Sequence, residues 1–268
     1  MTDLETAKYY ARRRIEKEQQ MSEDMARAYI RAFNRVLTLS FASGVSPSMF
    51  AFSRHFELDE KVKTAINKLV ADLYSIVEKY SFINLEYAKQ KNKRDEDLDI
   101  VGYINRPIKG NDINGRLAEY GENAKLEFEA YVAAGLLLKK PTNAILNEFK
   151  THFRQPYTSG LLREAWGLKG AQIASVRLLS KGISFGSGKY TSTFNSFARL
   201  GGATTDFGFN WADHQYMSRN GAIGYQVFRG SSYPCQICDD NTGFHIIGDI
   251  SLPVHSRCMC YATPVYSL

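Results

Sequence analysis

The chain has 268 residues, of which 44% are hydrophobic and 23% are charged, and its formal net charge is +6. A chain of this size can bury a core without disulfides, and no segment approaches the run of about 18 apolar residues that a membrane helix needs. We expect a globular protein without contact to a membrane. No leader pattern opens the chain, so we expect it to stay in the cytoplasm. Its mildly basic charge is compatible with binding to a nucleic acid or to an acidic protein surface, but it does not distinguish between these partners.

The first forty residues are predicted to form two helices. Thr2 and Glu5 have the spacing of a capping box, in which each side chain satisfies a backbone N–H of the other, and they open a charged helix that ends near Gln20. Ser22 is suited to cap a second helix. The apolar stripe of this second helix consists of Met25, Tyr29, Phe33 and Leu37, and the sequence GVSPS ends it.

Further helices are predicted through most of the chain. Apolar residues recur at helical spacing from Asp59 towards Lys89. The charged run KQKNKRDEDLD that follows is interpreted as a solvated helix end or a linker. Later helices are predicted at residues 114–140, 142–152, 158–180 and 203–219.

The last third of the chain has a different texture. Five glycines fall between Gly182 and Gly202, which is typical of a loop, and the segments GYQVFRG and CYATPVY have the β-branched and aromatic residues of short strands. We therefore predict an α+β protein with a mainly helical region at residues 1–180 and a small α+β domain at residues 181–268.

All four cysteines lie in the last 34 residues, as Cys235-x-x-Cys238 and Cys258-x-Cys260. Pairs of this kind in a cytoplasmic chain favour metal binding, because two cysteines separated by two residues can reach one ion from a tight turn. His255 precedes the second pair and gives five candidates for four places. We expect Cys235, Cys238 and Cys258 to be three of the ligands, with either His255 or Cys260 in the fourth position.

The ligand set favours a structural zinc ion, which would hold the small C-terminal domain together. It can fill all four positions of a tetrahedron, so that none is left for a catalytic water. No glutamate lies between Cys235 and the C-terminus to act as a general base, although three aspartates do. The remaining histidine of this region, His245, lies in GFHII, a predicted strand that directs its side chain elsewhere.

Two other motifs point to different chemistry and are weaker. The segment GISFGSGKY resembles a phosphate-binding loop, but its spacing is one residue too long and Tyr190 stands where the magnesium-binding hydroxyl belongs. His55-x-Glu57 and Cys235-x-x-Cys238 match the two halves of a zinc deaminase signature. Nearly 180 residues separate these halves, which does not fit that fold.

The cysteine region resembles the C-terminal domain of phage Mu-type minor head proteins, the phage head-morphogenesis family. The similarity covers about residues 180–268 and rests on the cysteine pair, a glycine and the ending LPVHSRCMC. The matching positions are Cys235, Cys238, Gly243, Leu252, Pro253, His255, Cys258 and Cys260. The family also places a helix start before its cysteines, which corresponds to the segment from Ala203 to Asp206. Ser256, Met259 and Asn241-Thr242 depart from the family pattern.

The resemblance implies a virion component that acts in capsid assembly, at the portal or the inner capsid. Its expected partners are the phage portal and capsid proteins, and its basic charge makes packaged DNA a further candidate partner. The expected location is the virion, and the host cytoplasm during assembly. The helical region would then bind the portal or the scaffold.

Two alternatives remain open. The first is a zinc-dependent enzyme or toxin of the nuclease, deaminase or ADP-ribosyltransferase type, but the His-Asn-His group of a nuclease and the Arg, Ser-x-Ser and Glu set of a transferase are not evident. The second is a zinc-containing DNA-binding module. Arg257 is the only lysine or arginine between residues 231 and 260, which argues against DNA binding by this segment itself.

Overall fold

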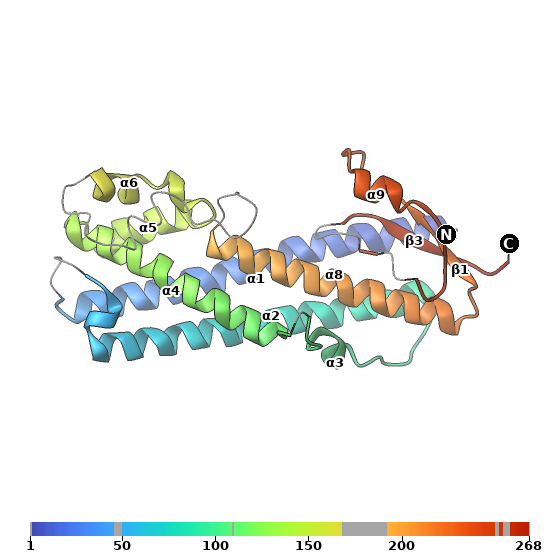
Figure 1. The fold of residues 1–268 in the computed structure, drawn as a ribbon, viewed down its shortest axis with the longest axis horizontal. Coiled ribbons are helices and arrows are strands. Elements are labelled where there is room, and N and C mark those ends of the chain that lie inside the picture. The colour runs from blue at the N-terminus through green and yellow to red at the C-terminus, as the bar shows by residue number, and fades with distance from the viewer. Residues whose placement is uncertain are drawn as a thin grey trace. The chain divides into compact units, whose positions relative to one another are not determined.

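Long helices make up most of the chain, and three short strands follow near its C-terminus (Figure 1). The computed structural model describes residues 2–45, 50–108, 110–167, 192–249, 252–253 and 258–267. Its helices are α1 (Asp3–Ala42), α2 (Phe56–Asn92), α3 (Ile100–Ile104), α4 (Ile113–Leu137), α5 (Thr142–His152), α6 (Gly160–Gly167), α8 (Thr193–Arg219) and α9 (Gln236–Asp240). Single 3-10 turns lie at Phe52–Arg54 and Pro156–Thr158. The strands are β1 (Gly224–Phe228), β2 (Gly243–Ile246) and β3 (Tyr261–Val265). A mainly helical α+β fold is therefore confirmed.

The chain divides into two compact units, each built from separate segments. Unit 1 consists of Met1–Glu23, Ser75–Ile113 and Arg199–Leu268, and unit 2 of Asp24–Tyr74 and Asn114–Ala198. The boundary predicted between residues 180 and 181 lies outside the described residues, so the two-domain division by sequence stays a prediction. Within the described residues, no helix is long and apolar enough to cross a membrane.

Helix α1 corrects the prediction of two helices with a break after Gln20. The capping box is present, with the Thr2 N–H 2.8 Å from Glu5 Oε2 and the Glu5 N–H 3.3 Å from Thr2 Oγ1. Beyond it the helix runs without interruption to Ala42, because Met21 is fully buried and continues the apolar stripe across the expected break. No glycine or proline interrupts the turn there, and Ser22 is accommodated inside the helix.

Helix α8 begins ten residues earlier than predicted. The expected helix start at Ala203–Asp206 is the interior of a helix that opens at Thr193, and Gly201 and Gly202 lie within it. A Cβ at Gly202 would lie 2.7 Å from Glu18 Oε1 of α1. This glycine therefore permits close packing of α8 on α1 and does not mark a loop.

Unit 2 has an aromatic core that encloses one carboxyl group. Phe33 stacks on Phe149 with ring centroids 3.8 Å apart, and Tyr29 packs against Phe128. Glu127 is fully buried among these rings, where its carboxylate accepts hydrogen bonds from the Tyr29 hydroxyl at 3.1 Å and from the Thr193 N–H at 3.0 Å. Burial raises the pKa of Glu127 to about 7.

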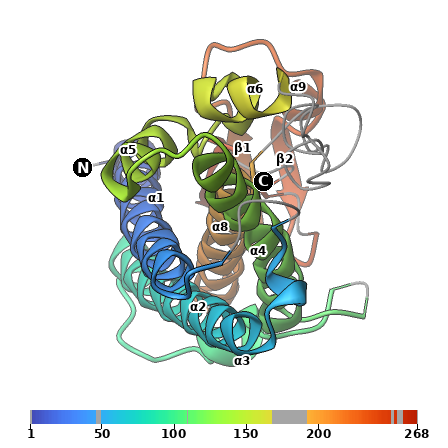
Figure 2. The same ribbon diagram turned by 90° about the vertical axis from the view of Figure 1, so that its left-hand side faces the viewer.

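Unit 1 carries the sheet, in which the strand order is β2-β1-β3 and both pairs are antiparallel. β1 and β2 are visible side by side in Figure 2. Tyr225 and Val227 of β1 point to one face and are almost fully buried. They share a core cluster with Met217 of α8 and with Ala262 of β3. The sheet therefore packs one face against the core and leaves the other face towards the surface.

Candidate metal centre

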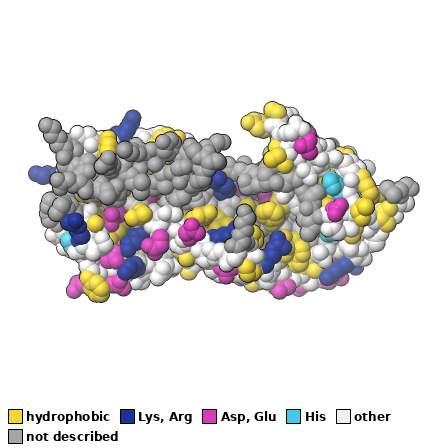
Figure 3. Space-filling view, in the orientation of Figure 1, with side chains coloured by type: hydrophobic (Ala, Val, Ile, Leu, Met, Phe, Trp, Pro, Cys, Tyr) yellow, Lys and Arg dark blue, Asp and Glu magenta, His cyan; other side chains and the backbone are white. Residues whose placement is uncertain are grey.

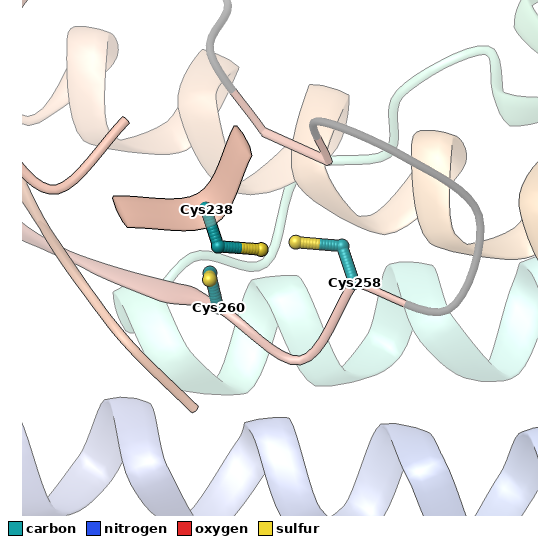
Figure 4. Close-up of side chains that lie close together, drawn as sticks. All are labelled: Cys238, Cys258 and Cys260. Atoms are coloured by element: carbon teal, nitrogen blue, oxygen red, sulfur yellow. The ribbon is translucent and has the colours of Figure 1, made fainter. Parts of the chain in front are cut away.

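The cysteines are contributed by two chain segments that the fold of unit 1 brings together. Cys238 lies in the short helix α9, and Cys258 and Cys260 lie in the segment that leads into β3. The Sγ atoms of these three residues all lie within 4.8 Å of one another, and all three side chains are buried. In Figure 4 the sulfur atoms of Cys238 and Cys258 point towards each other, with that of Cys260 close by. No disulfide joins the four cysteines, all of which are described.

Cys235 lies at the edge of this cluster. It is the N-cap residue of α9, it is half-buried, and its thiol is hydrogen-bonded to that of Cys238. With Cys238 and Cys260 it lines a pocket of about 210 Å³. Three of the five predicted ligands are thus brought into one cluster, and a fourth lies next to it.

Of the two histidines in this region, only His245 lies within the described residues. His255, the fifth predicted ligand, lies outside the described residues. The ring of His245 stacks on Tyr225 with centroids 5.5 Å apart, and its Nε2 lies 3.0 Å from the Asn241 carbonyl oxygen. Its expected orientation away from the cysteines agrees with these contacts.

Arg229 holds the first cysteine pair in place from the end of β1. Its guanidinium donates hydrogen bonds to the carbonyl oxygens of Tyr233 and Cys235 and to the carboxylate of Asp239. One side chain therefore fixes the approach to α9, the N-cap residue and the helix itself. Because guanidinium bonds of this kind are strong and directional, they orient the first pair before any ion is bound.

Gly230, just after β1, allows the backbone of the second cysteine pair to pass close to it. A Cβ at this position would lie 1.7 Å from the carbonyl oxygen of Met259, the residue between Cys258 and Cys260. No side chain larger than hydrogen fits there without moving one of the two backbones. The close contact between the end of β1 and the second cysteine pair thus depends on a glycine outside the cysteine motif.

Arg14 ties the second cysteine pair to the first helix. Its buried guanidinium lies 3.1 Å from the Asp206 carboxylate and donates a hydrogen bond of 3.0 Å to the Cys258 carbonyl oxygen. It also lies over the ring of Phe209 at 5.0 Å. Burial raises the pKa of Asp206 to about 6, against the opposing effect of the Arg14 charge.

The charged run after residue 88 is solvated only in part, because most of its first residues are buried at the end of α2. The ammonium group of Lys91 is buried, where it pairs with the Asp213 carboxylate at 2.5 Å and donates to the Ala262 carbonyl oxygen at 2.8 Å. The Asn92 amide donates to the same carboxylate at 2.7 Å. The end of α2 is therefore an anchor for β3, whereas the acidic residues at 95–97 are exposed, as expected for a solvated segment.

Two of the clustered thiols, those of Cys238 and Cys260, are held in their neutral form. Burial, with hydrogen bonding to Cys235, raises the pKa of Cys238 to about 11. The pKa of Cys260 is raised further, mainly by its hydrogen bond to Cys258 and then by burial. Without a cation these thiols stay protonated, whereas a bound metal ion compensates the charge of neighbouring thiolates.

The donor set also fits a metal ion sterically. Tetrahedral zinc with sulfur ligands at about 2.3 Å requires sulfur atoms roughly 3.8 Å apart. The three buried sulfur atoms, within 4.8 Å of one another, reach this spacing with small side-chain rotations. The cluster could therefore hold a metal ion.

No protein-family model, curated protein or solved structure matches the chain. A metal centre in this chain is therefore supported by its own contacts and sequence.

The two weaker motifs do not add to this centre. The glycine-rich segment GISFGSGKY lies outside the described residues. His55 and Glu57 belong to unit 2, at the start of α2, whereas the cysteines belong to unit 1. Among the described residues, the group of potential ligands that meets consists of cysteines alone.

Proposed function

We propose that the four cysteines bind one structural zinc ion, with Cys235 as the fourth ligand. The observation that carries this proposal is the meeting of three buried thiols from two segments of unit 1. Thiolate sulfur is a soft ligand, and a tetrahedral set of four sulfur atoms suits zinc better than magnesium or calcium. Cys235 is preferred to His255 because its thiol contacts Cys238 and lines the same pocket.

The proposed role of the ion is structural. It would join α9 to the segment before β3, two elements that lack a large core of their own. Zinc binding in small domains contributes on the order of 10 kcal/mol to folding, so this ion would supply much of the local stability. The carboxylate of Asp239, one residue after Cys238, is engaged by Arg229, and that of Asp206 is paired with Arg14, so both are poorly placed to activate a water. This arrangement supports a structural role over an enzymatic one.

We further propose that the whole protein is a structural component of a phage particle, a minor head protein that acts in capsid assembly beside the portal. The support is the similarity of LPVHSRCMC and the preceding cysteine pair to the minor head family, together with a mainly helical body. In this proposal the portal and capsid proteins are its partners, and zinc keeps the C-terminal part folded. Packaged DNA is a further candidate partner, supported by the net charge of +6.

Metal analysis tests the zinc proposal directly. We expect one zinc per chain after purification without added metal, and four thiols protected from a thiol reagent until a chelator is added. Cys235→Ser should lower zinc affinity strongly, whereas His255→Ala should leave it within a few-fold of the wild type. A chain without zinc whose native thiols all react freely would refute the proposal.

The assembly proposal needs a separate experiment. Particles made with a tagged copy should contain the protein, and crosslinking in intact particles should join it to the portal. Its absence from purified particles would refute this role and would leave the zinc proposal untouched.

A further inference from the structure

Helices α1 and α2 enclose a second pocket, whose lining belongs to unit 2 alone. The segment of α1 from residue 28 to 35 and the segment of α2 from residue 65 to 72 line this pocket, and its volume is about 380 Å³. The two helices run next to each other in Figure 2. Small-molecule sites have volumes of about 300–1,000 Å³, so this pocket can hold a compact ligand.

The floor of the pocket is apolar. It consists of Ala28, Ala32, Ala65 and Leu69, all of which are buried. Three of these four side chains are single methyl groups, which fill less of the space between two helices than larger apolar side chains do. The floor can therefore take an apolar group, whereas its side chains offer no hydrogen bond to a polar one.

The rim of the pocket is cationic. Arg31 and Arg35 of α1 and Lys68 of α2 line it together with one carboxylate, that of Asp72, which pairs with Lys68 at 3.2 Å. The lining therefore carries a net charge of +2. On the face drawn in Figure 3, by contrast, Lys and Arg side chains are interspersed with Asp and Glu. The rim would thus attract an anion.

The two arginines of the rim have no acidic partner in the described part of the chain. Arg27, one turn before Arg31, pairs with Asp24, but no described carboxylate pairs with Arg31 or Arg35. Like charges four residues apart destabilise a helix, and a bound anion would remove that repulsion. Guanidinium groups also bind the oxygen atoms of a phosphate in pairs, so two of them beside one pocket suit a phosphate group.

We propose that this pocket binds a small ligand in which a phosphate monoester is attached to an apolar body. The phosphate would lie between Arg31 and Arg35, with Lys68 on the opposite rim, and the apolar body would lie on the floor. A phosphate monoester carries a charge of about −2 near neutral pH, which matches the net charge of the lining. The site does not depend on the zinc ion or on a role in phage particles.

Other anions match the pocket less well. A single carboxylate would neutralise half of the net charge of the lining. Each phosphodiester of DNA also carries one charge, and a DNA strand held by its backbone would leave the apolar floor in contact with water. The combination of a doubly cationic rim and an apolar floor therefore favours the phosphate monoester.

Phenyl phosphate is a suitable probe, because it joins a phosphate monoester to an apolar ring. An NMR titration of the full-length chain should show saturable shifts confined to residues 28–35 and 65–72, with a dissociation constant of about 1 mM or lower. Inorganic phosphate lacks the ring and benzoate carries a single charge, so each should bind at least about threefold more weakly. Added salt should weaken the binding of all three, because the cations of the rim are exposed.

Substitutions in the rim should change the affinity in both directions. Arg31→Gln and Arg35→Gln should each weaken phenyl phosphate binding about tenfold, the usual effect of losing a hydrogen bond to a charged group. Arg27→Gln is the matched control, because it changes the same helix one turn away and leaves the lining intact. Asp72→Asn should strengthen binding about two- to fivefold, because it removes a carboxylate that repels the phosphate. Such a gain in affinity cannot result from loss of folded protein.

Three outcomes would overturn the proposal. The first is the absence of a saturable shift with phenyl phosphate up to about 20 mM. The second is an equal loss of affinity for Arg27→Gln and Arg31→Gln, which would indicate general attraction of anions to a basic chain. The third is tighter binding of a short DNA duplex to the same residues, which would make the pocket a nucleic-acid contact. Thermal melts verify the fold, and Arg31→Gln should not lower the melting temperature, because it relieves repulsion between like charges.

Discussion

Replacing Arg14 with methionine should destabilise unit 1 by about 3–5 kcal/mol, the usual loss when one partner of a buried ion pair is removed. The side chains of Arg14 and Asp206 are 3% and 4% exposed, so water can replace neither partner. The substitution also leaves the Cys258 carbonyl without its charged donor. Protonation of Asp206 should limit this loss of stability, because burial already raises the pKa of its carboxyl group to about 6.

The double variant Arg14→Met/Asp206→Leu distinguishes the cost of an unpaired buried carboxylate from the cost of lost packing contacts. Two apolar side chains of similar size leave no buried charge, so the pair should be more stable than Arg14→Met alone by at least about 1 kcal/mol. If the reasoning is wrong, the losses of the single variants will simply add. A loss of stability below about 1 kcal/mol for Arg14→Met would also contradict a stabilising role of the buried ion pair.

Fluorescence can follow this change in unit 1 by itself. The chain has two tryptophans, Trp166 in unit 2 and Trp211 in unit 1. In a Trp166→Phe background, denaturant unfolding monitored at Trp211 reports unit 1. The same titration with a zinc chelator tests whether the pair and the proposed metal stabilise the same unit, because an independent effect of Arg14 would be equal with and without the metal.

Three further predictions concern the cysteine segments and the buried carboxyl group. Arg229→Lys should weaken zinc binding about 10- to 100-fold in competition with a coloured chelator, because lysine cannot bind both carbonyl oxygens and the carboxylate; unchanged affinity would contradict its positioning role. Gly230→Ala should lower zinc content and melting temperature through its clash at Met259, whereas Gly167→Ala, with no atom within 4 Å of the new Cβ, should not. Since the pKa of Glu127 is raised from 4.5 to about 7, the folded chain binds this proton more tightly, and unit 2 should lose up to about 3 kcal/mol as the pH rises from about 4.5 to 7. Glu127→Gln should flatten that slope in thermal melts, and a slope equal to that of the wild type would refute this assignment.

Local patterns predicted most of the helices and strands. The predicted helices at 114–140 and 142–152 correspond to α4 and α5, and the segments GYQVFRG and CYATPVY form β1 and β3. The errors occurred where tertiary packing overrides local signals. Ser22 was interpreted as a cap and Gly201–Gly202 as a loop, although a continuous buried stripe and close packing against Glu18 keep both helices intact.

The sequence could predict which cysteines meet, but not the residues that hold them in place. Cysteine spacing marks the ligands because both members of a pair must reach one point. Arg14 lies 244 positions from Cys258, and no local pattern marks an arginine that will be buried so far away in sequence. The burial of Lys91 could not be predicted from the charged run around it, because its burial depends on which distant segment packs against it. Arg229 and Gly230 lie six and five residues before Cys235, and this closeness in sequence was the signal that could have pointed to them.

The contact between Arg14 and the second cysteine pair also sets the order in which the chain can fold during synthesis. Unit 2 ends at Ala198, so all of its segments have been translated while the cysteines are still to come. Unit 1 combines Met1–Glu23 with Arg199–Leu268, so its first segment is translated well before the cysteines. Until the segment that contains Cys258 has been translated, Arg14 lacks the carbonyl oxygen to which it donates. A chain truncated before residue 258 would leave the Arg14 guanidinium without the carbonyl oxygen to which it donates, and Asp206 would remain as its buried partner.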